Sequence, residues 1–450
     1  MKIKIIATYG PAIHSGAVLK KIIGHVDVFR INMSHGSSES WLEYIDKINA
    51  VSRSRKKEVA LLADLPGPKI RLGNLKEEIN VKKGSIVAFK YGESREGEVP
   101  LDFDIHKFVK KGSRLSIGDG IMDFLVEKVS KRRVISRAIN AGVLLSRKGI
   151  NISNGSVSAA SPTKDDIRLA KFAKKNGFDF IAMSFVKSAS DINTMRKKCN
   201  GMDIIAKIER NDAVNNISGI LEASDAIMVA RGDLAFEVKV EMLPIIQFHL
   251  INAARAASKP VIVATQMLAS MVNSPMPTRA EVTDIATAVT SGADCVMLSE
   301  ETAVGKYPLD AVNVLATTAK NAQSIITSNK KHFKISGIND SIAFAAADIA
   351  DNYRTDCIFA PTHSGATAKK LSALRPESNI IALCNFESVR KKLKIFYGVN
   401  SEPIKQYEDT DSMLSEIKRI ATRKGFRKYI VVSGSPHQRG STNTLKYIEH

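Results

Sequence analysis

The stretch 203–233 reads DIIAKIERNDAVNNISGILEASDAIMVARGD, and it decides the fold. It holds two nearly continuous apolar runs, 203–209 and 226–233, with a helical pattern between them. Continuous rather than alternating apolar character is typical of parallel strands that are covered on both faces. Each run ends in charged residues, KIER in the first and ARGD in the second. The stretch therefore predicts one strand–helix–strand unit of an α/β fold.

Six more runs of the same kind occur, at 3–8, 26–32, 59–65, 178–186, 260–266 and 294–301. Helical patterns separate the runs. In one of them, 161–176, Ser161 is the expected N-cap, Pro162 takes the first position and Gly177 ends the helix. Other helical patterns are 240–258, 278–290 and 308–325. Eight strand–helix units in about 230 residues predict a closed (β/α)8 TIM barrel.

Two parts of the chain lie outside this pattern. Residues 68–158 follow the third strand and contain short alternating stretches, which predict an inserted small β-barrel lid domain. The barrel would then take residues 1–67 and 159–326. Residues 327–450 predict a C-terminal α/β domain. Its expected helices are 341–353, 365–374 and 412–424, and its expected strands are 357–360, 380–383, 429–433 and 444–448.

The net charge of +20 fits either a nucleic-acid binder or an enzyme that attracts polyanionic substrates. Basic residues are spread along the chain and mixed with acidic ones, so solvated surface charge is the third explanation. No zinc-finger or RRM signature occurs, and we expect no nucleic-acid partner. The four cysteines are far apart and form no C-x-x-C pair. No apolar stretch is long enough for a signal segment or a membrane span, so we expect a cytoplasmic protein with no membrane partner.

The chemistry is expected at the carboxyl ends of the barrel strands, because these ends meet at one mouth where active sites lie. A single polar strand end is readily explained by solvation. Seven of the eight strands carry such residues, which solvation explains poorly. The strand ends contribute Arg30, Asn32, Ser34, His35, Asp64, Arg71, Ser184, Lys187, Lys207, Glu209, Arg231, Asp233, Thr265, Ser299 and Glu301.

Two carboxylates from adjacent strands predict a metal site. Glu209 and Asp233 offer hard oxygen ligands with room for water and phosphate oxygens, which suits Mg²⁺. The alternative is a structural pair bridged by Arg210 or Arg231. Lys207 stands two residues before Glu209, so both side chains face the same side of the strand.

A lysine beside a metal suits the neutralisation of a phosphoryl group, and Arg30 and Arg71 could join it. The alternative for Lys207 is a Schiff base, which nearby carboxylates disfavour because they hold the pKa of the amine up.

Gly232 precedes a possible helix start, where backbone N–H groups could hold a carboxylate or a phosphate. Neither a Walker nor a Rossmann glycine motif occurs, so a nucleotide would bind by other means. None of the nine histidines has metal-ligand spacing. His35, in a loop beside Asn32 and Ser34, is open to a structural or a site role.

These strand ends together resemble the pyruvate kinase family over essentially the whole chain. The segments that carry the resemblance are RINMSHG at 30–36, KIER at 207–210, IMVARGDL at 227–234, ATQML at 264–268, PTRAEVTD at 277–284 and MLSEETA at 297–303, followed by GKYP at 305–308. The resemblance implies transfer of a phosphoryl group from phosphoenolpyruvate to ADP, giving pyruvate and ATP, in the last step of glycolysis.

The resemblance also implies roles for single residues. Glu209 and Asp233 would bind Mg²⁺ or Mn²⁺, and Lys207 and Arg30 would act on the phosphoryl group. Gly232 and Thr265 would receive the substrate carboxylate. Thr265, Ser299 and Glu301 would support proton delivery to the enolate. The nucleotide would be held by Asn32, His35, Arg71 and Lys148.

A homotetramer is the family's usual state. Loops 362–367 and 435–443, the second with Arg439 and Gly440, resemble an effector site for a small phosphorylated molecule. The alternative is an ordinary strand–helix turn.

Three positions depart from the family pattern. The family's K⁺ site would draw on Asn32, Ser34, Asp64 and Leu65. Lys69 stands where many members have Glu, and its ammonium would replace the K⁺ charge, so we predict activity without K⁺. Glu300 and Ala235 replace usual glycines, and the carboxylate of Glu300 would repel a phosphate unless it points away.

Two rival functions remain at this stage. A Mg²⁺-dependent lyase or aldolase would use Glu209 and Asp233 without ADP or Lys148. A non-catalytic relative would lack one of Lys207, Glu209, Asp233 and Thr265, and all four are present.

Overall fold

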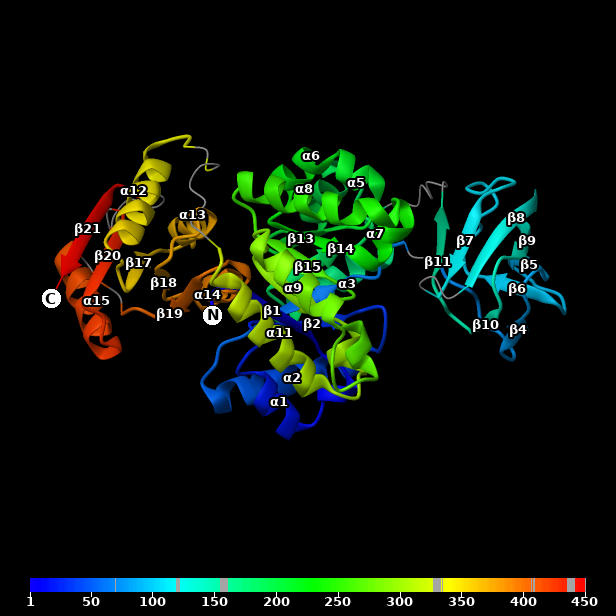
Figure 1. Ribbon diagram of the computed structural model, residues 1–450, viewed down its shortest axis with the longest axis horizontal. Coiled ribbons are helices and arrows are strands. Elements are labelled where there is room, and N and C mark those ends of the chain that lie inside the picture. Colours follow the sequence, from blue (N-terminus) through cyan, green and yellow to red (C-terminus); the bar gives the residue numbers. More distant parts are fainter. Residues whose placement is uncertain are drawn as a thin grey trace.

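The computed structural model describes residues 1–68, 70–118, 122–153, 161–326, 333, 335–405, 407, 409–434 and 442–449. Three parts lie in a row (Figure 1). The barrel is in the middle, the β-rich insertion lies on one side of it, and the C-terminal α/β domain lies on the other.

Eight parallel strands close the barrel in the order β1-β16-β15-β14-β13-β12-β3-β2, so the predicted TIM barrel is confirmed. Almost every residue of these strands is buried, which explains their continuous apolar character. Strands β1 and β2 end where predicted, and the other six end one to three residues earlier. Glu209, Asp233, Thr265 and Ser299 therefore lie just beyond a strand end, whereas Arg30, Asp64 and Lys207 lie within strands. The eight strands are β1 Lys4–Thr8, β2 Val28–Asn32, β3 Ala60–Asp64, β12 Phe180–Met183, β13 Asp203–Ile208, β14 Ala226–Ala230, β15 Val261–Ala264 and β16 Cys295–Leu298.

Helices surround this barrel (Figure 1). They are α1 Gly16–Ile22, α2 Ser38–Arg55, α3 Lys164–Lys175, α4 Ala189–Lys198, α5 Asn211–Asn215, α6 Ile217–Ala223, α7 Arg231–Glu237, α8 Leu243–Ala256, α9 Arg279–Thr290, α10 Glu300–Ala303 and α11 Pro308–Gln323. Short 3-10 turns occupy Pro11–Ile13, Val240–Met242 and Ala269–Val272.

The prediction that Ser161 caps a helix is wrong. Helix α3 begins at Lys164, and Thr163 is its N-cap. The Oγ1 of Thr163 accepts the N–H of Asp166 at 3.0 Å, and the Asp166 carboxylate accepts the N–H of Thr163 at 2.9 Å. This reciprocal pair satisfies two amide donors, which the earlier start would leave unpaired. Asp166 also accepts the N–H of Gly67 at 2.9 Å, so the cap ties α3 to the loop after β3.

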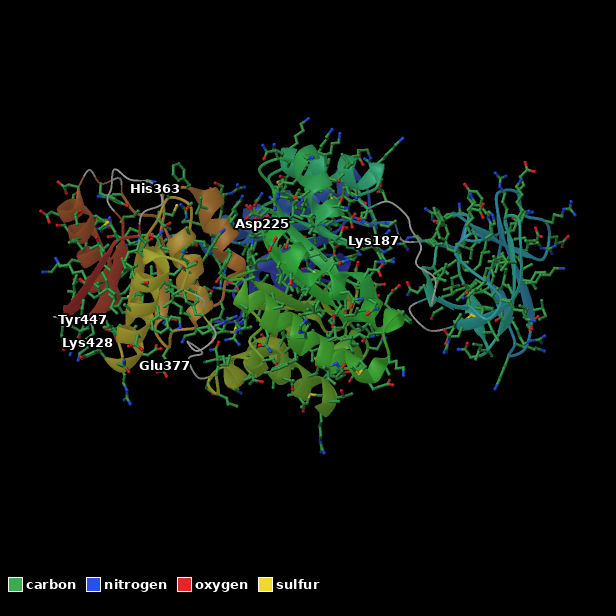
Figure 2. The ribbon with its side chains drawn as sticks, turned by 90° about the horizontal axis from the view of Figure 1, so that it is seen from above. Lys187, Asp225, His363, Glu377, Lys428 and Tyr447 are labelled. Atoms are coloured by element: carbon green, nitrogen blue, oxygen red, sulfur yellow. The ribbon has the colours of Figure 1, made fainter. Side chains whose placement is uncertain are left out.

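A repeated hydrogen bond holds the amino ends of the barrel strands. An aspartate just before one strand, or at its start, accepts an N–H of the neighbouring strand at 2.8 to 3.0 Å. The pairs are Asp27 with Ile5, Asp179 with Leu61, Asp225 with Ile204 and Asp294 with Val261. Figure 2 labels Asp225 on the side of the barrel that faces the C-terminal domain, and Lys187 on the side that faces the insertion.

The insertion is all-β and has its own core. Six strands form one sheet in the order β11-β7-β8-β9-β5-β6, and β10 pairs with β4. In this core the rings of Phe89 and Phe124 pack edge to face, with 5.2 Å between their centroids. The strands are β4 Ile79–Val81, β5 Ile86–Tyr91, β6 Glu98–Leu101, β7 Arg114–Ile117, β8 Met122–Ser130, β9 Arg133–Ala138, β10 Gly142–Leu144 and β11 Ile150–Ser153.

The C-terminal domain is a five-stranded sheet in the order β19-β18-β17-β20-β21, with β21 antiparallel. Its strands are β17 Cys357–Pro361, β18 Asn379–Leu383, β19 Val399–Glu402, β20 Lys428–Ser433 and β21 Thr444–Glu449. Its helices are α12 Ile338–Asn352, α13 Ala366–Leu374, α14 Glu387–Lys392 and α15 Thr410–Lys424. The sequence analysis missed α14, which is short and rich in charge, and β19, which has only four residues.

Basic residues of the C-terminal domain meet acidic residues at the amino ends of the barrel strands. The ion pairs are Arg375 with Asp294 at 2.9 Å, Arg390 with Glu58 at 2.9 Å and Lys392 with Asp203 at 2.5 Å. The opposite end of the barrel, where the strands have their carboxyl ends, faces the insertion. Among the described residues, no helix combines the length and the apolar character needed to cross a bilayer.

Candidate active site

A cavity of about 590 Å³ lies at the carboxyl ends of the barrel strands, between the barrel and the insertion. The barrel contributes residues from the ends of β2, β3, β12, β13, β14 and β16, as the strand-end pattern predicts. The insertion contributes Arg71 and residues 146–149. The described lining residues are Arg30, Asn32, Ser34, His35, Gly36, Asp64, Leu65, Pro66, Arg71, Ser146, Arg147, Lys148, Gly149, Ser184, Phe185, Lys207, Glu209, Asp233 and Glu300.

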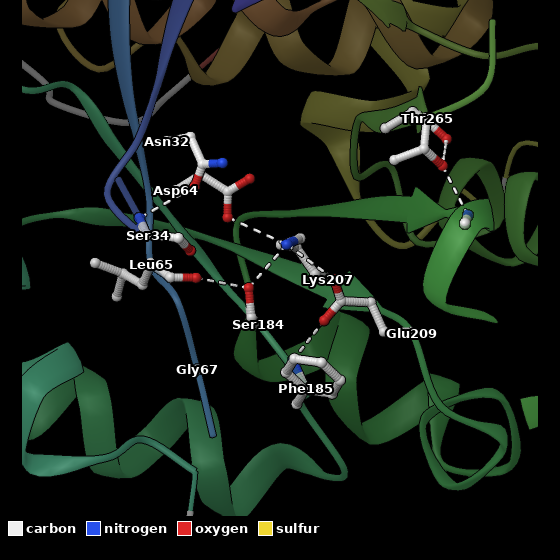
Figure 3. Close-up of polar contacts among 12 residues, drawn as sticks. Asn32, Ser34, Asp64, Leu65, Gly67, Ser184, Phe185, Lys207, Glu209 and Thr265 are labelled. Carbon is white, nitrogen blue, oxygen red and sulfur yellow. Dashed lines mark hydrogen bonds and ion pairs between the residues drawn. The ribbon is translucent and has the colours of Figure 1, made fainter. Parts of the chain in front are cut away.

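Lys207 lines this cavity and has three polar neighbours (Figure 3). Its Nζ lies 2.8 Å from Glu209 Oε1, 2.8 Å from Ser184 Oγ and 3.2 Å from Asp64 Oδ1. These three acceptors match the three protons of an ammonium group. Burial alone would lower the pKa of Lys207, but the charges of Asp64 and Glu209 outweigh it and raise the pKa. The charged form of the lysine is therefore favoured, which argues against the Schiff-base alternative because that chemistry needs a neutral amine.

Asp64 links Lys207 to the second cation of the site. Its Oδ2 accepts a hydrogen bond from Arg30 Nε at 2.7 Å, and Arg30 Nη1 donates to Thr8 Oγ1 at 2.9 Å. Burial opposes ionisation of Asp64, but the charges of Lys207 and Arg30 prevail and lower its pKa. The result is a buried array in which one carboxylate orients two cations toward the same cavity.

Glu209 and Asp233 lie in the same cavity, as predicted for a metal pair. Glu209 Oε2 accepts the N–H of Phe185 at 2.7 Å, whereas Oε1 is buried with no hydrogen-bond partner apart from its ion pair with Lys207. Burial raises the pKa of Glu209, and the charge of Lys207 opposes that shift.

A buried carboxylate oxygen beside a second carboxylate fits a hard divalent cation that keeps water or substrate as its other ligands. The structural alternative is not supported, because Arg210 pairs with Asp212 and Arg231 pairs with Asp284.

Thr265 and Gly232 form a second cluster, to one side of Lys207 (Figure 3). The N–H of Gly232 donates to Thr265 Oγ1 at 2.8 Å, and this hydroxyl donates to the carbonyl of Ala264 at 2.6 Å. Gly232 is the second residue of α7, so the helix begins before Gly232, not after it as predicted. Thr265, Gly232, Ser299 and Glu301 are not among the described residues that line the cavity.

Glu301 supports the strand ends and does not point at the cavity. It is buried, and its oxygens accept the N–H groups of Leu268 at 3.0 Å and Ser299 at 2.7 Å. The Oγ of Ser299 is buried and has no hydrogen-bond partner among the described residues. A proton route through Ser299 and Glu301 stays a prediction.

The four predicted K⁺ ligands lie together, and three of them already have a protein partner. Asn32 Oδ1 accepts the N–H of Ser34 at 3.1 Å, and the Leu65 carbonyl accepts Ser184 Oγ at 2.7 Å. Asp64 is paired with Lys207 and Arg30 as described. Lys69, on which the prediction of K⁺ independence depends, lies outside the described residues.

Basic groups gather at the open edge of the cavity. Arg71 Nη1 donates to the carbonyl of Arg147 at 3.1 Å, and Lys148 lies beside them. Burial and the charges of Arg71 and Arg30 lower the pKa of His35, so its ring is neutral near pH 7. Glu300 also lines the cavity, so it does not point away from the site, and the predicted repulsion of a phosphate group stays a prediction. Ala235 lies within α7, and nothing in the structure assigns it a consequence.

Sequence reasoning missed the roles of Ser184, Arg147 and Arg231. Ser184 had a usable signal, because it directly follows a predicted strand. Arg231 had the same signal, but its contacts with Thr265, Gln266 and Asp284 come from segments far away in the chain, as does the contact of Arg147 with Arg71.

A barrel mouth that combines a fixed lysine, two carboxylates and an edge of basic groups defines an enzyme of phosphoryl transfer. Residues 1–312 match the family model described as "Pyruvate kinase, barrel domain", and residues 340–448 match "Pyruvate kinase, alpha/beta domain". The chain therefore belongs to the pyruvate kinase family, and the predicted class of phosphotransferase is confirmed.

Curated relatives agree with this assignment over their full length. The chain is 36% identical to the pyruvate kinase of Thermococcus litoralis, with 100% of this chain and 98% of the relative covered. It is 37% identical to that of Agrobacterium vitis, with coverage of 99% and 96%. It is 34% identical to that of Thermotoga maritima, with coverage of 99% and 99%. Enzymes of this family use a divalent metal ion and K⁺.

Proposed function

We propose that this chain transfers the phosphoryl group of phosphoenolpyruvate to ADP at the barrel mouth, giving pyruvate and ATP in the last step of glycolysis. The observation that carries the proposal is the arrangement of Lys207 among Asp64, Glu209 and Ser184, at the base of a cavity with basic groups at its edge. A phosphoryl group in transfer has little covalent chemistry to be catalysed, so fixed positive charge is what an enzyme must supply.

Lys207 and Arg30 neutralise the oxygens of the moving phosphoryl group. All three acceptors of the Lys207 ammonium are protein atoms, so phosphoryl binding exchanges at least one of them for a substrate oxygen. Glu209 and Asp233 would hold Mg²⁺ or Mn²⁺, which when bound draws negative charge from the substrate oxygens. Asp64 keeps both cations in place during this exchange, since it contacts each of them.

Gly232 and Thr265 receive the substrate carboxylate. The Gly232 N–H donates to the Thr265 hydroxyl at 2.8 Å. A carboxylate oxygen of the substrate can accept the hydrogen bond of the Gly232 N–H in place of Thr265, or accept one from the Thr265 hydroxyl. After transfer, the enolate of pyruvate must gain a proton at C3. A water held by Thr265, with Ser299 and Glu301 behind it, would donate that proton.

Asn32, His35, Arg71 and Lys148 hold the nucleotide at the cavity edge. Lys148 and Arg71 belong to the insertion, so nucleotide binding would draw the insertion over the barrel mouth. Closure would exclude water that otherwise takes the phosphoryl group. A lyase or an aldolase would need neither Lys148 nor the insertion, and it would act without ADP. Strict dependence on ADP therefore distinguishes the proposed reaction from both alternatives.

The first test is pyruvate release from phosphoenolpyruvate, ADP and Mg²⁺ by the wild type, Lys207→Met and Lys171→Met. Lys171 is an exposed lysine of α3 and serves as the matched control. We expect Lys207→Met to lose several orders of magnitude in kcat, because it removes charge that the transition state needs. Full release without ADP, or an active Lys207→Met enzyme, would contradict the proposal.

K⁺ is expected to be dispensable. Arg30 and Lys207 already bring two positive charges to Asp64, and Lys69 adds a third close in sequence. The measurement is activity in tetramethylammonium buffer free of sodium and potassium, with K⁺ then added. A rise of tenfold or more on adding K⁺ would show that the site needs the monovalent ion.

The C-terminal domain is proposed to bind a small phosphorylated effector between loops 362–367 and 435–443. Thr367 Oγ1 lies 2.8 Å from Thr442 Oγ1, and the N–H of Thr442 donates to Asn339 at 2.9 Å, so the described ends of the two loops meet. Arg439 and Gly440 lie outside the described residues. Substrate saturation curves with sugar phosphates and AMP test this site, and unchanged curves count against it.

We also propose a cytoplasmic homotetramer. Exposed apolar side chains on and just before α8, Val240, Met242, Ile245 and Phe248, offer a surface that a second subunit would cover. Light scattering after size exclusion measures the mass, and a 49.1 kDa species would exclude the tetramer.

A further inference from the structure

Two consecutive residues at the end of β15 have strained backbones. Thr265 has φ +67° and Gln266 has φ +55°, which is the left-handed region that side chains other than glycine rarely adopt. Thr265 is β-branched, so its strain is greater than that of an ordinary residue. Such residues cost roughly 1–3 kcal/mol each and persist only where their surroundings hold them.

One guanidinium holds this turn. Arg231 Nη2 donates to the Thr265 carbonyl at 2.7 Å and to the Gln266 carbonyl at 3.2 Å, and Nε donates to the Thr265 carbonyl at 3.2 Å. Both strained residues therefore present their carbonyl oxygens to the same planar group. The flat, five-donor shape of arginine permits this, whereas a lysine would supply a single point of contact.

Arg231 is itself held from the opposite side. Its Nη1 donates to Asp284 of α9 at 2.5 Å, and only 7% of its side chain is exposed. Asp284 compensates a buried positive charge, which would otherwise be costly. The pair thus joins three elements: the end of β14, the turn after β15, and α9.

The turn fixes the Thr265 hydroxyl on the Gly232 N–H. Arg231 is connected to both groups. Gly232 is the next residue in the chain, and the carbonyl of Thr265 accepts hydrogen bonds from the Arg231 guanidinium. The two groups are in direct contact, because the N–H of Gly232 donates to Thr265 Oγ1 at 2.8 Å. Rotation of the strained turn would carry the hydroxyl away from the place where the substrate carboxylate and the proton-donating water are proposed to bind.

We infer that Arg231 and Asp284 are a positioning pair that sets the Thr265 hydroxyl for proton delivery to the enolate, without touching substrate. This inference rests on the proposed function. It separates two steps of the reaction: phosphoryl transfer depends on Lys207 and Arg30, whereas protonation of C3 depends on the Arg231–Asp284 pair.

The test compares Asp284→Asn with Asp212→Asn. The control changes the aspartate that pairs with Arg210 at the end of the neighbouring strand, a buried arginine with no contact to Thr265. The first readout is hydrogen–deuterium exchange of the peptide that covers residues 261–268. We expect faster exchange in Asp284→Asn and no change in Asp212→Asn. This readout needs no activity, so it stands even if the wild type makes no pyruvate and the proposed function fails.

The second readout separates the two chemical steps. ATP formation reports phosphoryl transfer. Exchange of the pyruvate methyl protons with D₂O, in the presence of Mg²⁺ and inorganic phosphate, reports proton transfer alone. We expect Asp284→Asn to lose at least tenfold in methyl exchange and less than threefold in the ATP-forming step at saturating substrate. Asp284→Glu, which keeps the carboxylate, should restore most of the exchange. Equal losses in both steps, or exchange rates that match Asp212→Asn, would overturn the inference.

Discussion

Lys207 shows what single residues contribute to this molecule. Its ammonium has an acceptor for each proton, and two of them are carboxylates. The third acceptor, Ser184, also donates to the Leu65 carbonyl, so it couples the lysine to the loop after β3. A neutral hydroxyl is the easiest of the three to replace by a substrate oxygen, because no charge pair is broken.

Ser184→Ala is expected to lower kcat about tenfold, or about 1.4 kcal/mol, because the lysine loses one of the three contacts that aim it. The free energy of unfolding should change little. Ser224→Ala is the matched control, since Ser224 is also buried but its hydroxyl donates within α6 to the Ile220 carbonyl. Steady-state kinetics of both variants check this, and equal rates for the two would show that Ser184 has no such role.

Glu300→Gln is expected to lower the KM for ADP several-fold at low ionic strength. The carboxylate of Glu300 faces the cavity edge that carries Arg71 and Lys148, so it repels the diphosphate. Added salt should remove the difference, because exposed charges are screened. Glu222→Gln, an exposed glutamate of α6, is the control. A raised KM in Glu300→Gln would mean that the carboxylate accepts hydrogen bonds from the nucleotide instead.

At the scale of elements, the helix starts behind the barrel mouth are fixed by reciprocal caps. In α9, Thr278 Oγ1 accepts the N–H of Glu281 at 3.2 Å, and Glu281 accepts the N–H of Thr278 at 2.8 Å. Glu281 also accepts from the N–H of Ser270 at 2.8 Å, which joins α9 to the loop after β15. The cap therefore holds the helix that carries Asp284 against the strained turn.

Thr278→Ala should destabilise the start of α9 by about 1 kcal/mol, the usual loss when a threonine N-cap is removed. A global unfolding curve of a multidomain chain is not two-state, so amide hydrogen exchange of α9 is the better measurement. Thr283→Ala is the control, because Thr283 lies exposed on the same helix and its hydroxyl donates to the Arg279 carbonyl within that helix. Equal protection in both variants would exclude the cap as the cause.

At the scale of the whole molecule, the two ends of the barrel have different tasks. The carboxyl ends of the strands carry the site and face the insertion. The amino ends carry aspartates that hold neighbouring strands and meet the basic residues of the C-terminal domain. Asp225 and Asp294 pair with arginines, and burial is the main influence on the pKa of Asp179.

Burial raises the pKa of Asp179 to about 7, although the N–H of Leu61 and the charge of Lys391 oppose the shift. The folded state therefore keeps a proton that the unfolded state loses near pH 4. Stability should fall as pH rises from about 4 to 7, by at most about 1.4 kcal/mol per pH unit, and then level off.

Asp179→Asn keeps the acceptor for Leu61 and has no proton to lose. We expect its thermal midpoint to fall less than that of the wild type between pH 5 and pH 8. Asp225→Asn, at the corresponding place before β14, is the control. Parallel curves for Asp179→Asn and the wild type would show that Asp179 titrates normally.

The sequence by itself determined the barrel, its eight strands and most of the site. A strand that is buried on both faces consists of a continuous run of apolar residues. This pattern can be recognised in the sequence of one strand alone, without knowing which strands lie beside it. The polar residues at the carboxyl end of each run then predict where the barrel mouth lies. This is how Arg30, Asp64, Lys207, Glu209 and Asp233 were identified as candidate site residues. Short elements such as the charged helix α14 and the four-residue strand β19 have no such signal.

Only the tertiary structure decided how these residues pair. Closure of the barrel brings Ser184 and Asp64 to Lys207, and Arg231 to Asp284, from separate strands and helices. The left-handed turn at Thr265 is likewise invisible in the sequence, because a threonine adopts it only under contacts made elsewhere. Periodicity reports burial within one element, whereas these contacts depend on the order and register of strands that the closed sheet imposes.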